Sequence, residues 1–124
     1  MKTLLTTICL GVLAVMLYVT VSASLQQDVL TATQRLWPDL WFRATLADAY
    51  CGFLFFWLWV AWREQSVAKG GLWFILIATL GNIAMASFLL LQLRTWHPRE
   101  GVAGLLLGPH RLPEPDDKEE IRRP

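Results

Sequence analysis

Residues 41–62 read WFRATLADAYCGFLFFWLWVAW, a run dominated by aromatic and aliphatic side chains. A helix needs roughly 20 predominantly apolar residues to cross ~30 Å of hydrocarbon, and this run is long enough. Arg43 lies near its start, and Asp48 is the charged residue that lies deepest in it. A chain of 124 residues that is 55% hydrophobic and only 17% charged could not bury this much apolar surface as a soluble domain. The sequence therefore predicts an all-α membrane protein.

Two further apolar runs lie on either side of this one, residues 4–21 and residues 72–93, and neither contains a charged residue. Residues 63–71 separate the second and third runs and end in Gly70-Gly71, which is typical of a turn between antiparallel helices. We expect a transmembrane domain of residues 1–96 with three transmembrane helices. Their predicted spans are about 4–22, 41–62 and 72–94, and the last two form an antiparallel hairpin.

The first run has two interpretations. Lys2 just before the eighteen uncharged residues 4–21 fits a retained signal anchor. The small residues Val21, Ser22 and Ala23 before Ser24 also fit a cleavage site, which would leave two spans. Because the apolar run is longer than the usual signal core of about 7–15 residues, we favour retention.

Residues 24–37 are too polar to span a membrane, but their apolar residues recur near helical spacing. Ser24 and Gln27 form a potential capping box, and Pro38 would end the helix. We expect a short interfacial helix here, between spans one and two, with an irregular loop as the alternative.

Residues 97–124 are predicted to form a flexible extramembrane tail, because His97-Pro98-Arg99 breaks the third span and residues 113–124 are rich in proline and charge. Residues 101–108 include Leu105-Leu106-Leu107, which could touch a membrane or a partner; we treat them as a linker.

Tryptophan and charge positions bear on the orientation. Indole rings prefer membrane interfaces, and three crossings place Trp37, Trp41 and Trp96 at one end and Trp57, Trp59, Trp62 and Trp73 at the other. The same crossings place Arg35, Arg43, Arg94, Arg99 and Arg111 on one side, opposite Lys2, Arg63 and Lys69. The positive-inside count favours a cytoplasmic tail, whereas the signal-anchor form favours a cytoplasmic N-terminus, which we adopt because the first span often dominates.

Asp48 is the most informative polar residue, because a carboxylate at membrane depth is costly unless it is paired, neutralised or functional. A candidate polar intramembrane site consists of Asp48 with Arg43, Thr45, Tyr50 and Ser87, the last expected at the level of Asp48 on the third span. One interpretation is a proton- or substrate-binding carboxylate, and the other, which we favour, is a polar group that fixes helix packing. Gly52, Gly81 and Asn82 are assigned to helix packing, because small and amide side chains mediate membrane-helix contacts.

The sequence contains no Gly-rich phosphate loop, nucleophile elbow or repeated Cys-x-x-Cys. Cys9 and Cys51 lie in apolar runs, and His97 and His110 lie outside the spans. We therefore expect no catalytic site, no metal and no cofactor, and no enzymatic activity. Because positive residues are dispersed and the net charge is +1, we expect no nucleic-acid partner.

Several stretches resemble a known family. Residues 41–50 (WFRATLADAY), residues 59–64 (WVAWRE), Gly81 and residues 89–93 (LLLQL) are similar to plant and bacterial membrane proteins grouped as domain of unknown function 1475. The resemblance covers roughly residues 4–93 and leaves out the tail beyond Trp96; Trp62 stands where such sequences often carry tyrosine. It implies that Thr45, Asp48, Tyr50 and Glu64 occupy motif positions, and it implies no activity.

Three functions follow as hypotheses. We expect first a non-catalytic accessory or scaffold subunit that packs against membrane lipids and against helices of itself or of another membrane protein. The alternatives are a small oligomeric proton-coupled transporter using Asp48, and a lipid- or pigment-handling protein. The expected location is a membrane, as a multi-pass protein of the bacterial plasma (inner) membrane.

Overall fold

The computed structural model describes residues 1–97 and 101–108, and the described residues form helices and no strand. The helices follow one another as α1 (Lys2–Gln26), α2 (Val29–Leu36), α3 (Leu40–Glu64), α4 (Val67–Leu80), α5 (Asn82–Thr95) and α6 (Gly101–Leu107). Side-chain oxygens cap three of them, because Asp28, Asp39 and Ser66 accept hydrogen bonds from backbone N–H groups in the first turns of α2, α3 and α4. The all-helical prediction is confirmed for the described residues.

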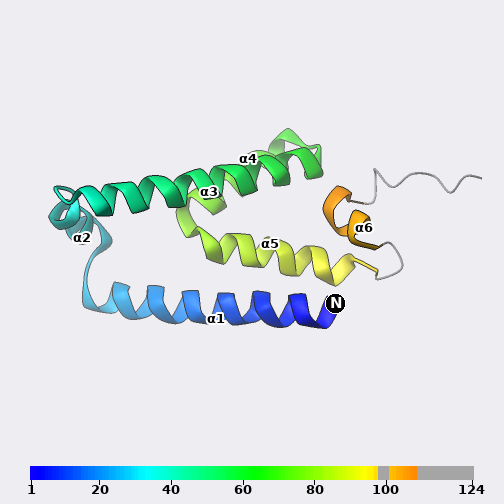
Figure 1. The fold of residues 1–124 in the computed structure, drawn as a ribbon, viewed down its shortest axis with the longest axis horizontal. Helices are drawn as coiled ribbons and strands as arrows, with labels where there is room; N and C mark the ends of the chain where they lie inside the picture. Colours follow the sequence, from blue (N-terminus) through cyan, green and yellow to red (C-terminus); the bar gives the residue numbers. More distant parts are fainter. Residues whose placement is uncertain (98–100, 109–124) are drawn as a thin grey trace, which may run out of the picture.

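Two helices are long. Both α1 and α3 contain 25 residues and are long and apolar enough to cross a membrane. At 1.5 Å per residue each measures about 37 Å, which exceeds the ~30 Å hydrocarbon thickness. They run in opposite directions along the long axis of the molecule (Figure 1).

The third apolar run does not form the continuous helix predicted for residues 72–94. It is divided at Gly81 into α4 and α5, of 14 residues each. Gly81 has φ 55° and ψ −125°, a backbone conformation that an L side chain rarely adopts. At about 21 Å, neither half is long enough to cross ~30 Å of hydrocarbon by itself.

The chain reverses at Gly81, and α5 runs back toward the end where α4 began (Figure 1). Gln92 near the end of α5 donates a hydrogen bond to Glu64 at the end of α3, with a length of 3.1 Å. The Trp96 carbonyl accepts a 2.7 Å hydrogen bond from Lys2 at the start of α1. Trp96 therefore lies at the end opposite Trp37, and its predicted grouping with Trp37 and Trp41 was wrong.

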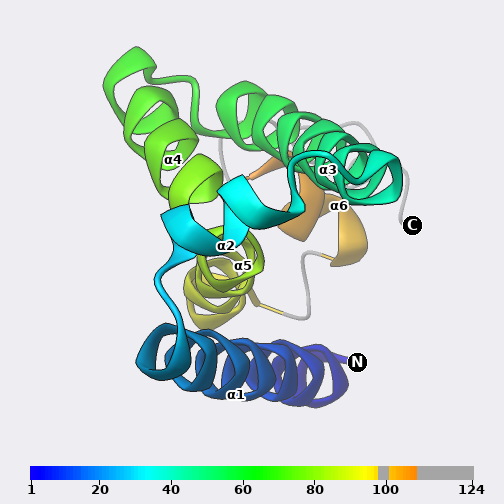
Figure 2. The ribbon, with the colours of Figure 1, turned by 90° about the vertical axis from the view of Figure 1, so that its left-hand side faces the viewer.

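We call the two ends of the molecule the connector end, which holds Met1, the connection at residues 65–66 and α6, and the α2 end. Near the connector end, α5 packs between α1 and the hairpin formed by α3 and α4 (Figure 2). Toward the α2 end, α4 and α5 stop and the long helices continue without them. In α1, residues 17–26 are exposed except for the half-buried Ser22.

One of two buried clusters lies between α3, α4 and α5. Phe88 is completely buried and packs edge-to-face against the rings of Phe56, Trp59 and Trp73, at centroid distances of 6.1, 5.7 and 4.9 Å. These edge-to-face contacts place the positive ring edge against the negative ring face, which favours this packing. Aromatic side chains of α3 thus form part of the surface against which α5 packs.

The two short helices differ from the sequence expectations. A helix does form between the long helices, but α1 continues to Gln26, and α2 is capped by Asp28 rather than by Ser24. Residues 101–107 of the predicted flexible tail form α6, whose Leu105 packs with Cys9, Leu93 and Trp96. The expectation of a disordered segment at residues 113–124 lies outside the described residues.

Candidate functional site

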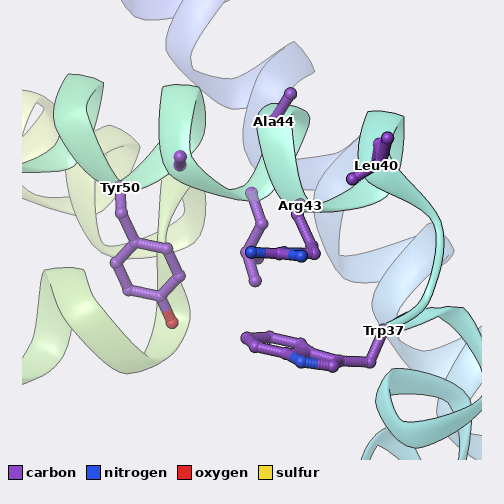
Figure 3. A pocket seen from close by; sticks show the side chains of 7 residues that line it. Trp37, Leu40, Arg43, Ala44 and Tyr50 are labelled. Atoms are coloured by element: carbon purple, nitrogen blue, oxygen red, sulfur yellow. The ribbon is translucent and has the colours of Figure 1, made fainter.

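The candidate site lies at the α2 end, on the first three turns of α3. Asp39 precedes the helix and accepts a 2.9 Å hydrogen bond from the Phe42 N–H, which fixes where the helix begins. One turn later, the Arg43 guanidinium carbon lies 5.8 Å from the centre of the Trp37 ring, within cation–π range. Figure 3 shows the guanidinium plane above the indole ring. This contact holds the Arg43 side chain over the turn between α2 and α3.

A groove of about 520 Å³ runs beside these residues. Most of its lining is aliphatic or aromatic, with Arg43 as its charged group; the lining residues are Trp37, Leu40, Arg43, Ala44, Leu46, Ala47 and Tyr50. We call it the α2–α3 groove. Its shape and apolar walls suit a side chain or an acyl chain more than a polar metabolite.

Asp48 is exposed on α3, about 12 Å along the helix axis from Leu40. It makes no hydrogen bond or ion pair with any residue that the structure describes. The Thr45 hydroxyl does not bind the Asp48 carboxylate, because it donates a 2.8 Å hydrogen bond to the Trp41 carbonyl of its own helix. The Asp48 carboxylate therefore lies on the outer surface of the monomer.

Ser87 occupies a different level from the one predicted, whereas Tyr50 lies near Asp48 on α3 as expected and bonds to α4. The Tyr50 hydroxyl donates a 3.4 Å hydrogen bond to the Ala78 carbonyl in the last turn of α4, just before the chain reverses. Ser87 lies farther along α5, beside Phe88, and donates its hydroxyl to the Ile83 carbonyl at 2.7 Å. The prediction that Ser87 lies level with Asp48 was wrong, because it assumed a third helix that continues past Gly81.

The three residues assigned to helix packing have different surroundings. Gly81 is buried, and a Cβ atom there would lie 2.7 Å from Cζ of Phe53, so close approach requires glycine. Gly52 is exposed, and a Cβ atom added there would meet nothing within 4 Å, so it contributes nothing to packing within the chain. Asn82 is exposed at the first position of α5. Of these three residues, only Gly81 packs closely against another part of the described chain.

A second polar cluster lies at the connector end and was not included in the predicted site. Glu64 accepts the hydrogen bond from Gln92 and also lies 3.7 Å from the Lys69 ammonium. Nearby, the Trp57 indole N–H donates a 2.9 Å hydrogen bond to the Gly70 carbonyl. These contacts join α3 to both α4 and α5, so Glu64 has a clear structural role. Its place in the Arg-Glu pair after the aromatic run was the sequence signal that could have identified it.

The described side chains of the candidate site do not form a converging set of groups. Within residues 1–97 and 101–108, no group of three His, Cys, Asp or Glu side chains lies close enough to hold a metal ion. The groups of the candidate site, Arg43, Thr45, Asp48 and Tyr50, extend over the surface of one helix and do not converge on a common point.

Comparison with protein families gives a match. A family described as "Protein of unknown function (DUF1475)" matches residues 2–112. The match continues past Trp96, so the expectation that the tail lies outside the resemblance was wrong for residues up to 112. No curated protein and no solved structure matches the chain.

Proposed function

The chain belongs to this family of proteins of unknown function, DUF1475, and for it we propose the role of a small membrane-embedded subunit that acts by packing against other membrane helices. The proposal rests on one observation. Asp48 lies on an exposed surface of a helix long and apolar enough to span a membrane, and no described residue of its own chain pairs with it.

The first step of the argument concerns the membrane. We infer that α1 and α3 cross the bilayer, and that α4 and α5 together enter and leave it at the connector end. Backbone that is not helical is tolerated at membrane depth only where protein or water covers it. The turn at Gly81 meets this condition, because Gly81 is buried against Phe53.

This arrangement also gives an orientation. Because α5 folds back, Arg94 joins Lys2, Arg63 and Lys69 at the connector end, while Arg35 and Arg43 remain at the α2 end. The positive-inside rule now favours a connector end in the cytoplasm. A signal anchor with a cytoplasmic N-terminus predicts the same orientation. In a bacterium, the compartment is then the plasma membrane.

The second step concerns the cost of Asp48. A charged side chain at the centre of a bilayer costs about 2.5–3.5 kcal/mol or more, and carboxylates at membrane depth therefore face a partner or water. At the same level, the side chains of Ala44 and Ala47 are small and exposed, which allows another helix to approach closely. A partner helix on this part of α3 would remove the carboxylate from lipid.

Native mass spectrometry of the full chain, released gently from its own membrane, tests the proposal. We expect an assembly of fixed stoichiometry, either several copies or the chain with a second protein, and a smaller assembled fraction for Asp48→Asn. Asp28→Asn is the matched control, because asparagine caps α2 as well as aspartate and the residue lies off α3. A chain that is monomeric in every mild detergent would contradict the proposal.

A second candidate, a small oligomeric proton-coupled transporter, is favoured by the helix break at Gly81, because interrupted helices line many transport sites. In such an oligomer Asp48 would face a cavity shared between copies. Asp48→Asn should then abolish a proton-dependent flux into proteoliposomes while the assembled fraction stays intact. An unchanged flux in that variant would exclude Asp48 as the coupling carboxylate.

A further inference from the structure

One exposed surface of α3, on the side opposite Phe53 and Val60, carries a regular stripe. Its members recur at alternating spacings of four and three residues, which is the heptad pattern of helices that pack along their length. All six are exposed: Leu40, Ala44, Ala47, Cys51, Leu54 and Leu58. We call this set the outer stripe.

No member of the outer stripe belongs to the buried clusters of the described residues, although Leu54 also lines a pocket with Phe74, Ile77 and Ala78 of α4. The core-facing residues of α3, such as Val60 and Phe53, contact α4 and α5 from the other side of the helix. Leu40 is 75% exposed, and Leu54 and Leu58 are 47% and 49% exposed. Three of the six members are alanine or cysteine, and Leu40, Ala44 and Ala47 also line the α2–α3 groove. A second helix can therefore approach the backbone of α3 closely here.

Charges flank the stripe on both sides. In the heptad defined by the outer stripe, Arg43 immediately precedes the a position Ala44, which makes it a g residue, and Asp48 immediately follows the d position Ala47, which makes it an e residue. Side chains at e and g form the ion pairs between the helices of a coiled coil. In two parallel copies in register, Arg43 of each copy lies on the same side of the interface as Asp48 of the other.

The opposite charges of Arg43 and Asp48 indicate that this surface binds a second copy of the same chain. Two-fold symmetry generates two Arg43–Asp48 pairs from one surface, so the same patch recognises itself. An antiparallel pair would bring g residues together, and the other g residues of this stripe are Tyr50 and Trp57, which cannot pair with Arg43 as an acid would. The parallel arrangement is also the one that copies inserted with a single orientation can form.

We propose that a second copy of this chain packs along the outer stripe of α3, as a parallel dimer in which Arg43 of each copy pairs with Asp48 of the other. This inference rests on the proposed function and specifies the partner. The pairing removes the Asp48 carboxylate from lipid. To reach Asp48 of the other copy, the Arg43 guanidinium must move away from its position over the Trp37 ring.

Disulfide crosslinking in native membranes tests the contact. Cys51 is an a residue, so the two copies of Cys51 face each other, and the small neighbours allow the Cα atoms to approach to roughly 4.4–6.8 Å, the disulfide range. In a Cys9→Ala background, mild oxidation should convert the full chain into a covalent dimer. The matched control is Cys51→Ser with Thr45→Cys, which places an exposed thiol on α3 away from the stripe. Equal crosslinking through the two positions, or none through Cys51, would overturn the inference.

A charge exchange tests the ion pair itself. Arg43→Asp sets two carboxylates against each other across each side of the interface, and we expect the crosslinking rate to fall at least about tenfold. Adding Asp48→Arg restores opposite charges and should recover most of the rate. Failure of the double variant to recover, while both variants are still inserted in the membrane, would contradict the pairing.

The inference and the proposed function can fail separately. If native mass spectrometry shows the chain bound to a different protein at fixed stoichiometry and Cys51 does not crosslink, the dimer is wrong and the subunit role stands. If the chain is monomeric and Cys51 does not crosslink, both are wrong. A covalent dimer through Cys51 alone, sensitive to Arg43→Asp, supports both.

Discussion

Lys2 donates a 2.7 Å hydrogen bond from its ammonium nitrogen to the carbonyl oxygen of Trp96, 94 residues away in the chain. The contact joins the first turn of α1 to the C-cap of α5. It therefore places the start of α1 and the end of α5 at the same end of the molecule. Three complete crossings would have placed them on opposite sides.

Thiol labelling from each side of the membrane tests this arrangement. In a background of Cys9→Ala and Cys51→Ala, we expect Val67→Cys and Thr95→Cys to react with a membrane-impermeant reagent from the same side, and Gln27→Cys from the other. All three positions are exposed, and Val67 is 95% exposed. Labelling of Thr95→Cys together with Gln27→Cys would show that residues 72–94 cross the bilayer instead.

Gly81→Ala should destabilise the fold, because the substitution introduces a Cβ 2.7 Å from Cζ of Phe53 and imposes a φ of 55° on an L residue. Backbone strain of this kind costs about 1–3 kcal/mol, and overpacking adds to it. Thermal unfolding in detergent measures the loss. Gly71→Ala is the control in α4, where an added Cβ meets nothing within 4 Å. Equal stabilities of the two variants would mean that the turn at Gly81 is not rigid.

Phe88→Ala should also lower stability, through a different mechanism. In a membrane, the free energy of transferring the Phe88 ring from lipid into the protein is small. The substitution nevertheless leaves a cavity, and the rings of Phe56, Trp59 and Trp73 that line it lose packing contacts. With a cavity term of roughly 24 cal/mol per Å³, removal of most of a phenyl ring costs about 2 kcal/mol. Phe55→Ala removes a ring that is 73% exposed and should change the monomer stability little. A comparable loss in both would contradict the assignment of Phe88 to the core.

Glu64 joins α3 to two helices through contacts of unequal strength. Lys69 is 67% exposed, and such a surface ion pair contributes about 0–1 kcal/mol, so Lys69→Ala should be nearly silent. Glu64→Ala also removes the acceptor for Gln92 in a half-buried environment and should cost about 1–2 kcal/mol more. Glu64→Gln keeps an acceptor and should lie between them. Chemical denaturation of the three variants side by side measures the order, and a reversed order would mean that the ion pair dominates.

The sequence was sufficient to predict the existence of the long helices, because residues 4–21 and 41–62 are longer than typical strands and nearly free of charge. It was not sufficient for residues 72–94. A single glycine in an apolar run occurs where two membrane helices pack closely, and it also occurs where a helix ends in a turn. The residues next to Gly81 do not distinguish these two possibilities. The difference arises from Phe53, 28 positions earlier, whose ring fills the space that a Cβ would occupy.

The errors in the candidate site follow from that one break. Trp96 was grouped with Trp37, and Ser87 was placed level with Asp48, because a continuous third helix was assumed. Arg43, Thr45, Asp48 and Tyr50 depended only on the geometry of α3, and their placement on one exposed helix could be predicted. The formation of α6 could not, since Leu105 becomes buried only through Cys9, Leu93 and Trp96.

The unequal lengths of the helices give the molecule a taper. Among the described residues, α1, α3, α4 and α5 share the half near the connector end with the short α6, whereas α4 and α5, at 14 residues, do not reach the other half beside the 25-residue α1 and α3. In a bilayer, such a wedge displaces more lipid from one leaflet than from the other. The leaflet that surrounds the wider half is therefore expanded, and we expect the protein to partition into curved membranes that relieve this mismatch, which its distribution between small and large vesicles would measure.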